Sequence, residues 1–172
     1  RIGTDLYKIA SFDIVNHQLL RAGAKTGKPV IMSVGMSNLD EIEDAYNILK
    51  EGTDCIAILH CISSYPTIEK DSKLSNIYKI QEKYNCIIGQ SDHSNDIKVP
   101  IYAAAAGAQI LEKHFKIDNN FECVDAPVSI TEVQMKKLVE EVRGLEVIFG
   151  KENFGIRSSE EQTAVFRRLI KD

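Results

Sequence analysis

The segment AQILEKHFKI, residues 108–117, begins as a small apolar run and then places three ionisable residues, Glu112, Lys113 and His114, in a row. A buried charge is costly unless it is paired or bound to a metal. In an extended strand, residues two apart share a face, so Glu112 and His114 point one way and Lys113 the other. This strand end is therefore a candidate site.

A second strand-like run ends in the same manner, at Ser91, Asp92 and His93. Alternation places Ser91 and His93 on one face and Asp92 on the other, toward helices or loops. If the two strands are neighbours, His93 and His114 meet, and two imidazoles suit a divalent transition metal. The alternative is that each histidine is a core residue with satisfied hydrogen bonds.

Polar residues also follow the other apolar runs of the chain. They are Lys8, Ser11 and Asp13, then Ser33, then Ser63, Ser64 and Tyr65. In parallel α/β folds, function gathers at the carboxyl ends of strands. A lysine with several hydroxyls suits a phosphate group, through a point charge and hydroxyl donors. The GKP at 27–29 does not fit a P-loop.

Short apolar runs alternate with helical patterns at intervals of about 20 to 30 residues, which is the length of one βα unit. The predicted strands are 6–11, 29–35, 55–63, 86–93 and 108–115. Several are nearly continuous hydrophobic stretches, as parallel strands covered on both faces are. Two α/β architectures fit: a five-stranded doubly wound sheet, or the later part of a (β/α)₈ barrel of about 250 residues.

Helical periodicity predicts helices within 37–52, 72–85 and 131–150, and a last helix from Ser158 or Ser159 through Ile170. Asn38 with Glu41, and Thr131 with Gln134, have the spacing of capping boxes. The region 116–127 is predicted to be a loop.

The composition excludes several classes of protein. The chain has 172 residues, 44% hydrophobic and 27% charged, and a net charge of −4, which gives no reason to expect nucleic acid or an anionic membrane as partner. The longest apolar stretch is too short to span a bilayer. Four cysteines without a C-x-x-C pair are expected to be reduced core residues of a cytoplasmic protein.

The motifs together resemble a known family. KIAS (8–11), GKPVIMSVGM (27–36), LHCISSYPT (59–67), GQSDHS (89–94) and LEKHF (111–115) are similar, in order and spacing, to the sialic acid synthases. These are the N-acetylneuraminate synthases and their bacterial relatives. The resemblance covers nearly the whole chain.

The resemblance implies a (β/α)₈ barrel of which this chain holds the C-terminal five βα units, its fourth to eighth strands. The implied reaction condenses phosphoenolpyruvate with an N-acetylated amino sugar, such as N-acetylmannosamine. It yields a nine-carbon 2-keto sugar acid and phosphate, as in polysaccharide biosynthesis. The implied cofactor is a divalent metal, typically Mn²⁺, with Mg²⁺ and Co²⁺ as alternatives.

Carried over position by position, the resemblance implies the following roles. His93 and His114 hold the metal, and Glu112 is the acidic catalytic residue beside it. The residues implied in substrate binding are Lys8, Ser11, Ser33, Ser63 and Ser91 for phosphoenolpyruvate, and Asp13, Tyr65 and Asp125 for the sugar.

The chain departs from the family pattern at three places, and these bear on the identity of the sugar. Ser63 stands where an Asn is common, and Asp13 where a Glu is common. ECVDAPVSI (122–130) keeps Asp125 and Ser129 but replaces a Gly-Pro. A precursor of legionaminic or pseudaminic type is therefore an alternative acceptor.

The expected organisation is a partial barrel over 1–155 and a helix over 156–172 that leads toward an antifreeze-like domain absent here. The family's first three strands, which carry an essential Glu, are also absent, so the chain alone is expected to be inactive. A homodimer is expected for the full-length enzyme. The rival interpretations are an inactive remnant with a structural or binding role, and another metal-dependent aldol-type synthase.

Overall fold

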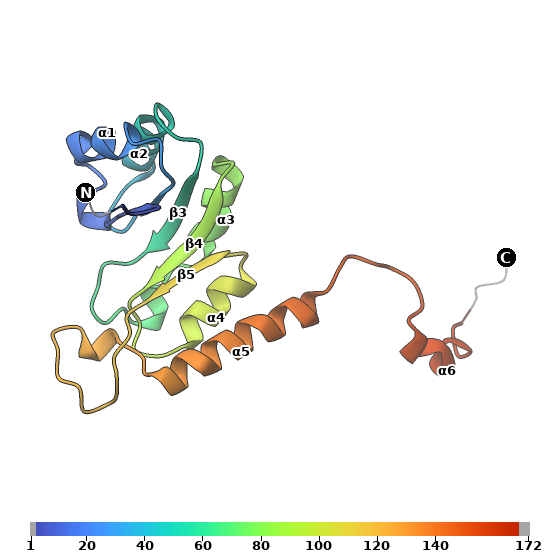
Figure 1. Cartoon of the computed structure of the whole chain (residues 1–172). Helices are drawn as coiled ribbons and strands as arrows, with labels where there is room; N and C mark the ends of the chain where they lie inside the picture. Colours follow the sequence, from blue (N-terminus) through green and yellow to red (C-terminus); the bar gives the residue numbers. More distant parts are fainter. Residues whose placement is uncertain (1–2, 169–172) are drawn as a thin grey trace.

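The computed structural model describes residues 3–168 and shows one parallel sheet (Figure 1). Its strand order is β1-β2-β3-β4-β5, the same as the order in the chain. The strands are β1 Tyr7–Ile9, β2 Val30–Ser33, β3 Ile56–Cys61, β4 Ile87–Asp92 and β5 Ile110–Lys113. Each lies inside the segment predicted for it, one or two residues shorter at either end.

The strand order decides between the two architectures. A doubly wound sheet would place a later strand on the other side of β1, whereas here every strand pairs in parallel with its neighbours in sequence. The prediction of a barrel arc is confirmed: the five strands form a half-barrel. Within residues 3–168, β1 and β5 each have only one paired edge.

Helices connect the strands. They are α1 His17–Ala24, α2 Leu39–Lys50, α3 Ser75–Lys83, α4 Lys98–Ala105, α5 Glu132–Phe149 and α6 Glu161–Ala164. The helical periodicity of the sequence did not predict α1. This helix starts where the Asn16 side chain accepts a hydrogen bond from the Leu19 N–H. It also did not single out α4, whose alanine-rich sequence has weak amphipathic contrast.

Both predicted capping interactions are present. The Asn38 side chain accepts from the Glu41 N–H at 2.9 Å, and the Glu41 carboxylate accepts the Asn38 N–H at 2.8 Å. At the start of α5, the Gln134 side-chain oxygen accepts the Thr131 N–H at 3.0 Å.

The last predicted helix is shorter than expected. A 3₁₀ turn, Ser158–Glu160, leads into α6, which ends at Ala164. Most side chains there are exposed, and a short helix without packing partners is marginal. Figure 1 shows this segment extending away from the sheet beyond α5. Leu169 and Ile170 lie outside the described residues.

The loop prediction for 116–127 holds for most of its length, since the first regular turn after β5 is the 3₁₀ helix Ala126–Val128. The cysteine prediction is wrong in part. All four cysteines are free, but only Cys61 is buried, while Cys55 and Cys123 are exposed. Both exposed cysteines lie just outside regular elements, where the apolar pattern does not determine burial.

The hydrophobic core lies between the sheet and its helices. Strand residues such as Ile9, Met32 and Ile58 pack there against helix residues such as Leu20 and Ile77. Each strand turns alternate residues to this core and the remainder to the opposite face. Within the described residues, no helix is both long and apolar enough to cross a membrane.

Candidate active site

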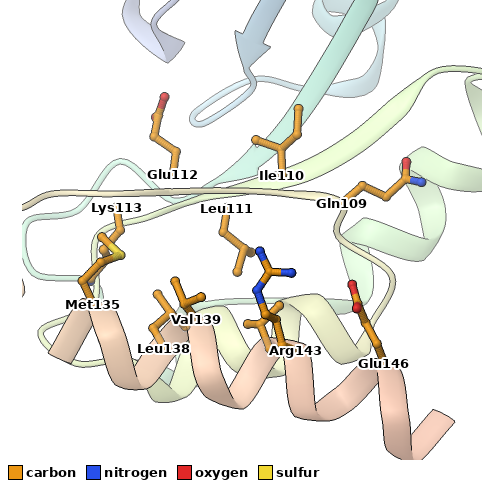
Figure 2. Close-up of a pocket in the computed structure, with 11 residues that line it drawn as sticks. Gln109, Ile110, Leu111, Glu112, Lys113, Met135, Leu138, Val139, Arg143 and Glu146 are labelled. Atoms are coloured by element: carbon orange, nitrogen blue, oxygen red, sulfur yellow. The ribbon is translucent and has the colours of Figure 1, made fainter. Parts of the chain in front are cut away.

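The face of the sheet away from the helices carries Ser91, Glu112 and the other strand residues of the predicted site. Strand register places Cys61 beside Ser91 and Ser91 beside Glu112, and side chains at paired positions share a face. In β5, alternate residues point to opposite sides of the strand. Glu112 points away from α5, and Lys113 points toward α5 (Figure 2). The face pattern predicted for the two polar strand ends is confirmed.

Glu112 joins the first and the last strand of the sheet. Its Oε2 atom lies 3.4 Å from the Lys8 Nζ atom, and its Oε1 atom accepts a hydrogen bond from the Ser91 hydroxyl at 2.6 Å. The carboxylate is therefore held by a cation and a hydroxyl donor. Three of the sequence-predicted residues form one connected group.

His93 and His114 lie together beside this group. Their ring centroids are 5.3 Å apart, and the rings are tilted by 59°. The Tyr65 ring packs against His93, with centroids 4.1 Å apart, and meets His114 edge to face, with centroids 5.8 Å apart. Two strand ends and the loop after β3 thus bring three rings into one cluster.

Each imidazole has a partner on its Nδ1 atom. The His93 Nδ1 atom lies 2.9 Å from the Ile62 carbonyl oxygen, and the His114 Nδ1 atom lies 3.5 Å from the Asp125 carboxylate. The Ser129 hydroxyl donates to the Asp125 carbonyl at 2.7 Å and so ties the loop of Asp125 down. Such partners orient imidazoles that bind metals through the other nitrogen.

The donor set fits a metal that takes two protein ligands and completes its shell with water or substrate. Within residues 3–168, no group of three or more His, Cys, Asp and Glu side chains is arranged to hold an ion. Catalytic metal sites leave positions open for exchangeable ligands, and imidazole is a suitable ligand for a transition metal.

The surroundings shift the pKa values of the two histidines in opposite directions. Burial lowers the pKa of His93, but the hydrogen bonds to the Cys61 thiol and the Ile62 carbonyl outweigh it, and the pKa is raised overall. Burial lowers the pKa of His114, and this outweighs the attraction of the Asp125 carboxylate. His114 is therefore the more readily neutral of the two.

Cys61 is a buried neighbour of His93, with its sulfur 3.8 Å from the Nδ1 atom. Burial raises the pKa of the thiol, but hydrogen bonds with His93, Ser11 and Ser63 together lower it overall. Cys61 was expected from the sequence to be a reduced core cysteine, with no role in the site. Its inward position follows from the register with Ser91.

Small side chains line the carboxyl ends of β1 to β3. The Ser11 hydroxyl oxygen accepts the Gly35 N–H at 2.9 Å, and the Ser63 hydroxyl lies 3.7 Å from the Cys61 sulfur. The buried Ser33 hydroxyl has no hydrogen-bond partner among the described residues. A ligand hydroxyl, phosphate oxygen or water would satisfy it.

Gly35 is a second residue that the sequence analysis did not assign to the site. A Cβ atom there would lie 2.3 Å from the Ser63 hydroxyl oxygen. The glycine is required because side chains from the ends of β1 and β3 fill this space. The sequence signal that could have indicated this role is the position of Gly35, just after the end of β2 at Ser33 and before α2.

Two sequence-predicted residues differ from the others: Tyr65 contacts the imidazoles but is partly exposed, and Asp13 lies at the end of another strand. Tyr65 is 46% exposed, and burial of its remainder raises the pKa of its hydroxyl. Asp13 ends the 3₁₀ helix Ser11–Asp13 at the carboxyl side of β1. Asp13 lies at the same end of the sheet as the other residues. It follows β1, however, whereas His93 follows β4, three strands away.

Comparison with known proteins gives this arrangement its context. The model of the NeuB family matches residues 1–154. An uncharacterized protein of Methanocaldococcus jannaschii is 40% identical over 151 residues, 87% of this chain and 45% of that protein. A pseudaminic acid synthase of Campylobacter jejuni is 35% identical over 165 residues, 95% of this chain and 48% of that protein. The chain spans about half the length of these curated relatives.

One solved structure is closely similar in backbone. The N-acetylneuraminic acid synthetase of Leptospira borgpetersenii superposes with a TM-score of 0.90 at 40% identity. The match covers 96% of this chain and 58% of that one. The half-barrel is thus the same kind of fold as part of that enzyme.

Proposed function

The chain belongs to the NeuB family, and from that premise we propose that it carries part of the active site of a synthase of sialic acid type. The proposed reaction condenses phosphoenolpyruvate with an N-acetylated amino sugar to give a nine-carbon 2-keto sugar acid and phosphate. The observation that supports it best is the group of Lys8, Glu112 and Ser91 beside the pair His93 and His114.

We propose that His93 and His114 hold a divalent metal, with Mn²⁺ as the first choice and Mg²⁺ or Co²⁺ as alternatives. When bound, the metal supplies Lewis-acid polarisation of the sugar aldehyde. Support comes from the imidazole spacing and from the partners on both Nδ1 atoms.

Lys8 and the nearby hydroxyls would bind the phosphate of phosphoenolpyruvate. A charged donor and short hydroxyl side chains make charge-assisted hydrogen bonds to phosphate oxygens. Ser91 already donates to Glu112, and the Ser33 hydroxyl lacks a partner within residues 3–168. Ser11 and Ser63 complete the polar lining at the ends of β1 and β3.

In the proposed reaction, the methylene carbon of phosphoenolpyruvate forms a bond to the aldehyde carbon of the open-chain sugar. Water adds to the carbon that bears the phosphate, and the bond from that carbon to the phosphate oxygen breaks. Glu112 would orient the water and accept its proton, and the aldehyde oxygen would take up a proton as it becomes a hydroxyl. Its contact with Lys8 keeps it near the phosphate.

The sugar would lie at Tyr65, Asp125 and Asp13. Tyr65 packs on both imidazoles and is partly exposed, as a residue that lines a substrate site is. The relatives named above include a pseudaminic acid synthase and an N-acetylneuraminic acid synthetase. We therefore propose an N-acetylated amino sugar as the substrate class. The assay below determines which sugar of this class is the substrate. A homodimer and a cytoplasmic location are further proposals for the full-length enzyme.

The test joins this chain to the N-terminal half of the Leptospira synthetase to make a complete barrel, here called the joined barrel. Phosphate release is followed with Mn²⁺, phosphoenolpyruvate and, in turn, N-acetylmannosamine and the diacetylated precursors of legionaminic and pseudaminic acids. The same N-terminal half joined to its own C-terminal half is the positive control. Lys8→Ala and His93→Ala joined barrels are negative controls.

We expect the joined barrel to release phosphate with at least one sugar, and the 172-residue chain alone to release none. A chain without the remaining strands leaves the reacting centre open to water, which weakens its electrostatic stabilisation. Failure with all sugars, while the control barrel works, would refute the proposal. Condensation of the sugar with an unphosphorylated 2-keto acid would favour the rival metal-dependent aldol-type synthase.

A further inference from the structure

A buried ion pair lies on the other face of the sheet, directly behind the two histidines. The Lys113 Nζ atom is 2.7 Å from the Asp92 Oδ2 atom. The two side chains are 1% and 3% exposed, which makes this pair far more buried than Lys8 with Glu112. The proposed reaction assigns no role to either residue.

Further hydrogen bonds satisfy this ion pair. Asp92 accepts from the Ser94 hydroxyl at 2.6 Å and from the Ser94 N–H at 3.2 Å, and its other oxygen accepts from Gln90 at 3.3 Å. Lys113 also donates to the Ser94 carbonyl. A buried pair needs such extra bonds because they offset the loss of water around both charges.

The pair occupies the end of the strand ladder. Asp92 and Lys113 are the last paired positions of β4 and β5, and His93 and His114 follow them directly in sequence. The backbone link between these strands therefore ends one residue before each imidazole. At that position the ion pair links the two strands through side chains. Ser94, the residue after His93, extends this link because it bonds to both Asp92 and Lys113.

We infer that Asp92 and Lys113 are positioning residues that set the distance between the imidazoles of His93 and His114 and thereby the affinity for the metal. The inference rests on the proposed function. Because the pair joins the two residues that precede the histidines, its loss lets β4 and β5 separate at this end. Two imidazoles that no longer converge bind one ion less tightly.

Stability alone is the competing explanation, and a double variant separates the two. Replacing a whole buried ion pair by neutral side chains of similar size is often close to neutral for stability, whereas removing one partner is strongly destabilising. Asp92→Asn with Lys113→Met should therefore restore the folding that Lys113→Met alone loses. It should not restore the link that orients the strand ends.

The experiment titrates Mn²⁺ into the full 172-residue chain and, in parallel, into the joined barrel, and reads bound metal by electron paramagnetic resonance. Urea unfolding of each protein reports its stability. The matched control removes another cross-element ion pair, Glu43 with Lys83 between α2 and α3, by Glu43→Gln with Lys83→Met. That pair lies away from the histidines.

We expect the Asp92→Asn, Lys113→Met protein to unfold near the wild-type urea midpoint and to bind Mn²⁺ about tenfold more weakly, the lower end of the effect of outer residues on metal affinity. The control should bind Mn²⁺ as the wild type does. Equal affinity in the double variant and the wild type would overturn the inference. Absence of Mn²⁺ binding by both wild-type proteins would instead refute the proposed metal site.

Discussion

Lys8 is the residue whose loss should separate the two substrates. It contacts Glu112 at 3.4 Å from the opposite edge of the sheet. If it binds phosphate, Lys8→Ala removes a charge-assisted hydrogen bond of about 1.5–3 kcal/mol. In the joined barrel, KM for phosphoenolpyruvate should rise by about 10- to 100-fold, and KM for the sugar should change little. Steady-state kinetics with each substrate varied checks this, with Lys8→Arg as the charge-conserving control. An equal rise for both substrates would count against the phosphate assignment.

Gly35 follows β2 and lies where side chains from the ends of β1 and β3 meet. An alanine Cβ would lie 2.3 Å from the Ser63 oxygen, 2.9 Å from the Ser11 oxygen and 3.1 Å from the Cys61 sulfur. Overpacking of this kind costs about 1–3 kcal/mol. Gly35→Ala should lower the free energy of unfolding by that amount in a urea titration. Ser63→Ala removes the nearest oxygen, so adding it should recover part of the loss. Simple additivity of the two substitutions would contradict this explanation.

His60 should make stability depend on pH. Burial lowers the pKa of His60, although its hydrogen bond to the Ser72 carbonyl at 2.7 Å acts in the other direction. Below about pH 6.5, the ordinary histidine value, the unfolded chain takes up a proton more readily than the folded one. Acid therefore favours unfolding, and stability at this residue is retained above that pH.

The measurement compares urea unfolding at pH 7.5 and pH 5.5. His60→Gln should reduce the loss of stability between these two pH values, whatever it does to stability at pH 7.5. The control is His17→Gln, because His17 is exposed at the start of α1. An unchanged pH dependence in His60→Gln would show that other groups are responsible.

At this scale, the sequence indicated the site because alternation along a strand is strictly periodic. Ser91 with His93, and Glu112 with His114, could be placed on one face from spacing alone. The pairing of Asp92 with Lys113 could not, since it depends on strand register and on Ser94 in the following loop. Spacing within one strand says nothing about which residue lies opposite.

At the scale of elements, α2 offers a direct test of a motif read from the sequence. The Asn38 side chain accepts from the Asp40 and Glu41 N–H groups, both at 2.9 Å. Asn38→Ala leaves these N–H groups without that acceptor and should lower the free energy of unfolding by about 1 kcal/mol. Asn38→Asp keeps an acceptor and should change stability little. Urea titration measures both, and equal loss in the two variants would argue against capping as the cause.

Strands and capped helices were predictable because each has a strong local signal. The five strands are apolar runs, and α2 and α5 have caps with periodic apolar residues. The short α6 was predicted too long, because the sequence pattern does not reveal that most side chains of residues 158–168 are exposed. The choice of barrel over doubly wound sheet required strand order, which no local pattern encodes.

At the scale of the whole molecule, the free edge of β5 and the exposed side of α5 form one groove (Figure 2). It has a volume of about 740 Å³, with lining residues that include Leu111, Met135, Val139 and Val142. An apolar groove beside an unpaired strand edge is the surface that another parallel strand would cover. In a complete barrel, that strand would come from the remaining half.

The last prediction concerns this groove and uses two separate chains, this one and the N-terminal half of the Leptospira synthetase. Val139 lines the groove and is 44% exposed, so Val139→Glu should leave this chain folded. When the other half docks, the new carboxylate would be buried without a partner, which is costly. Binding between the halves, measured by titration calorimetry, should weaken by about 100-fold, roughly 2.7 kcal/mol, and phosphate release should fall with it.

The matched control is Val133→Glu, the same substitution on the same helix. Val133 is 78% exposed and is not among the residues that line the groove. It makes the same change of side chain and net charge as Val139→Glu does, so it tests whether the effect depends on the groove. If both variants weaken association equally, the added N-terminal half does not cover this groove. Association would then be controlled by net charge, because the two substitutions differ only in where the carboxylate lies.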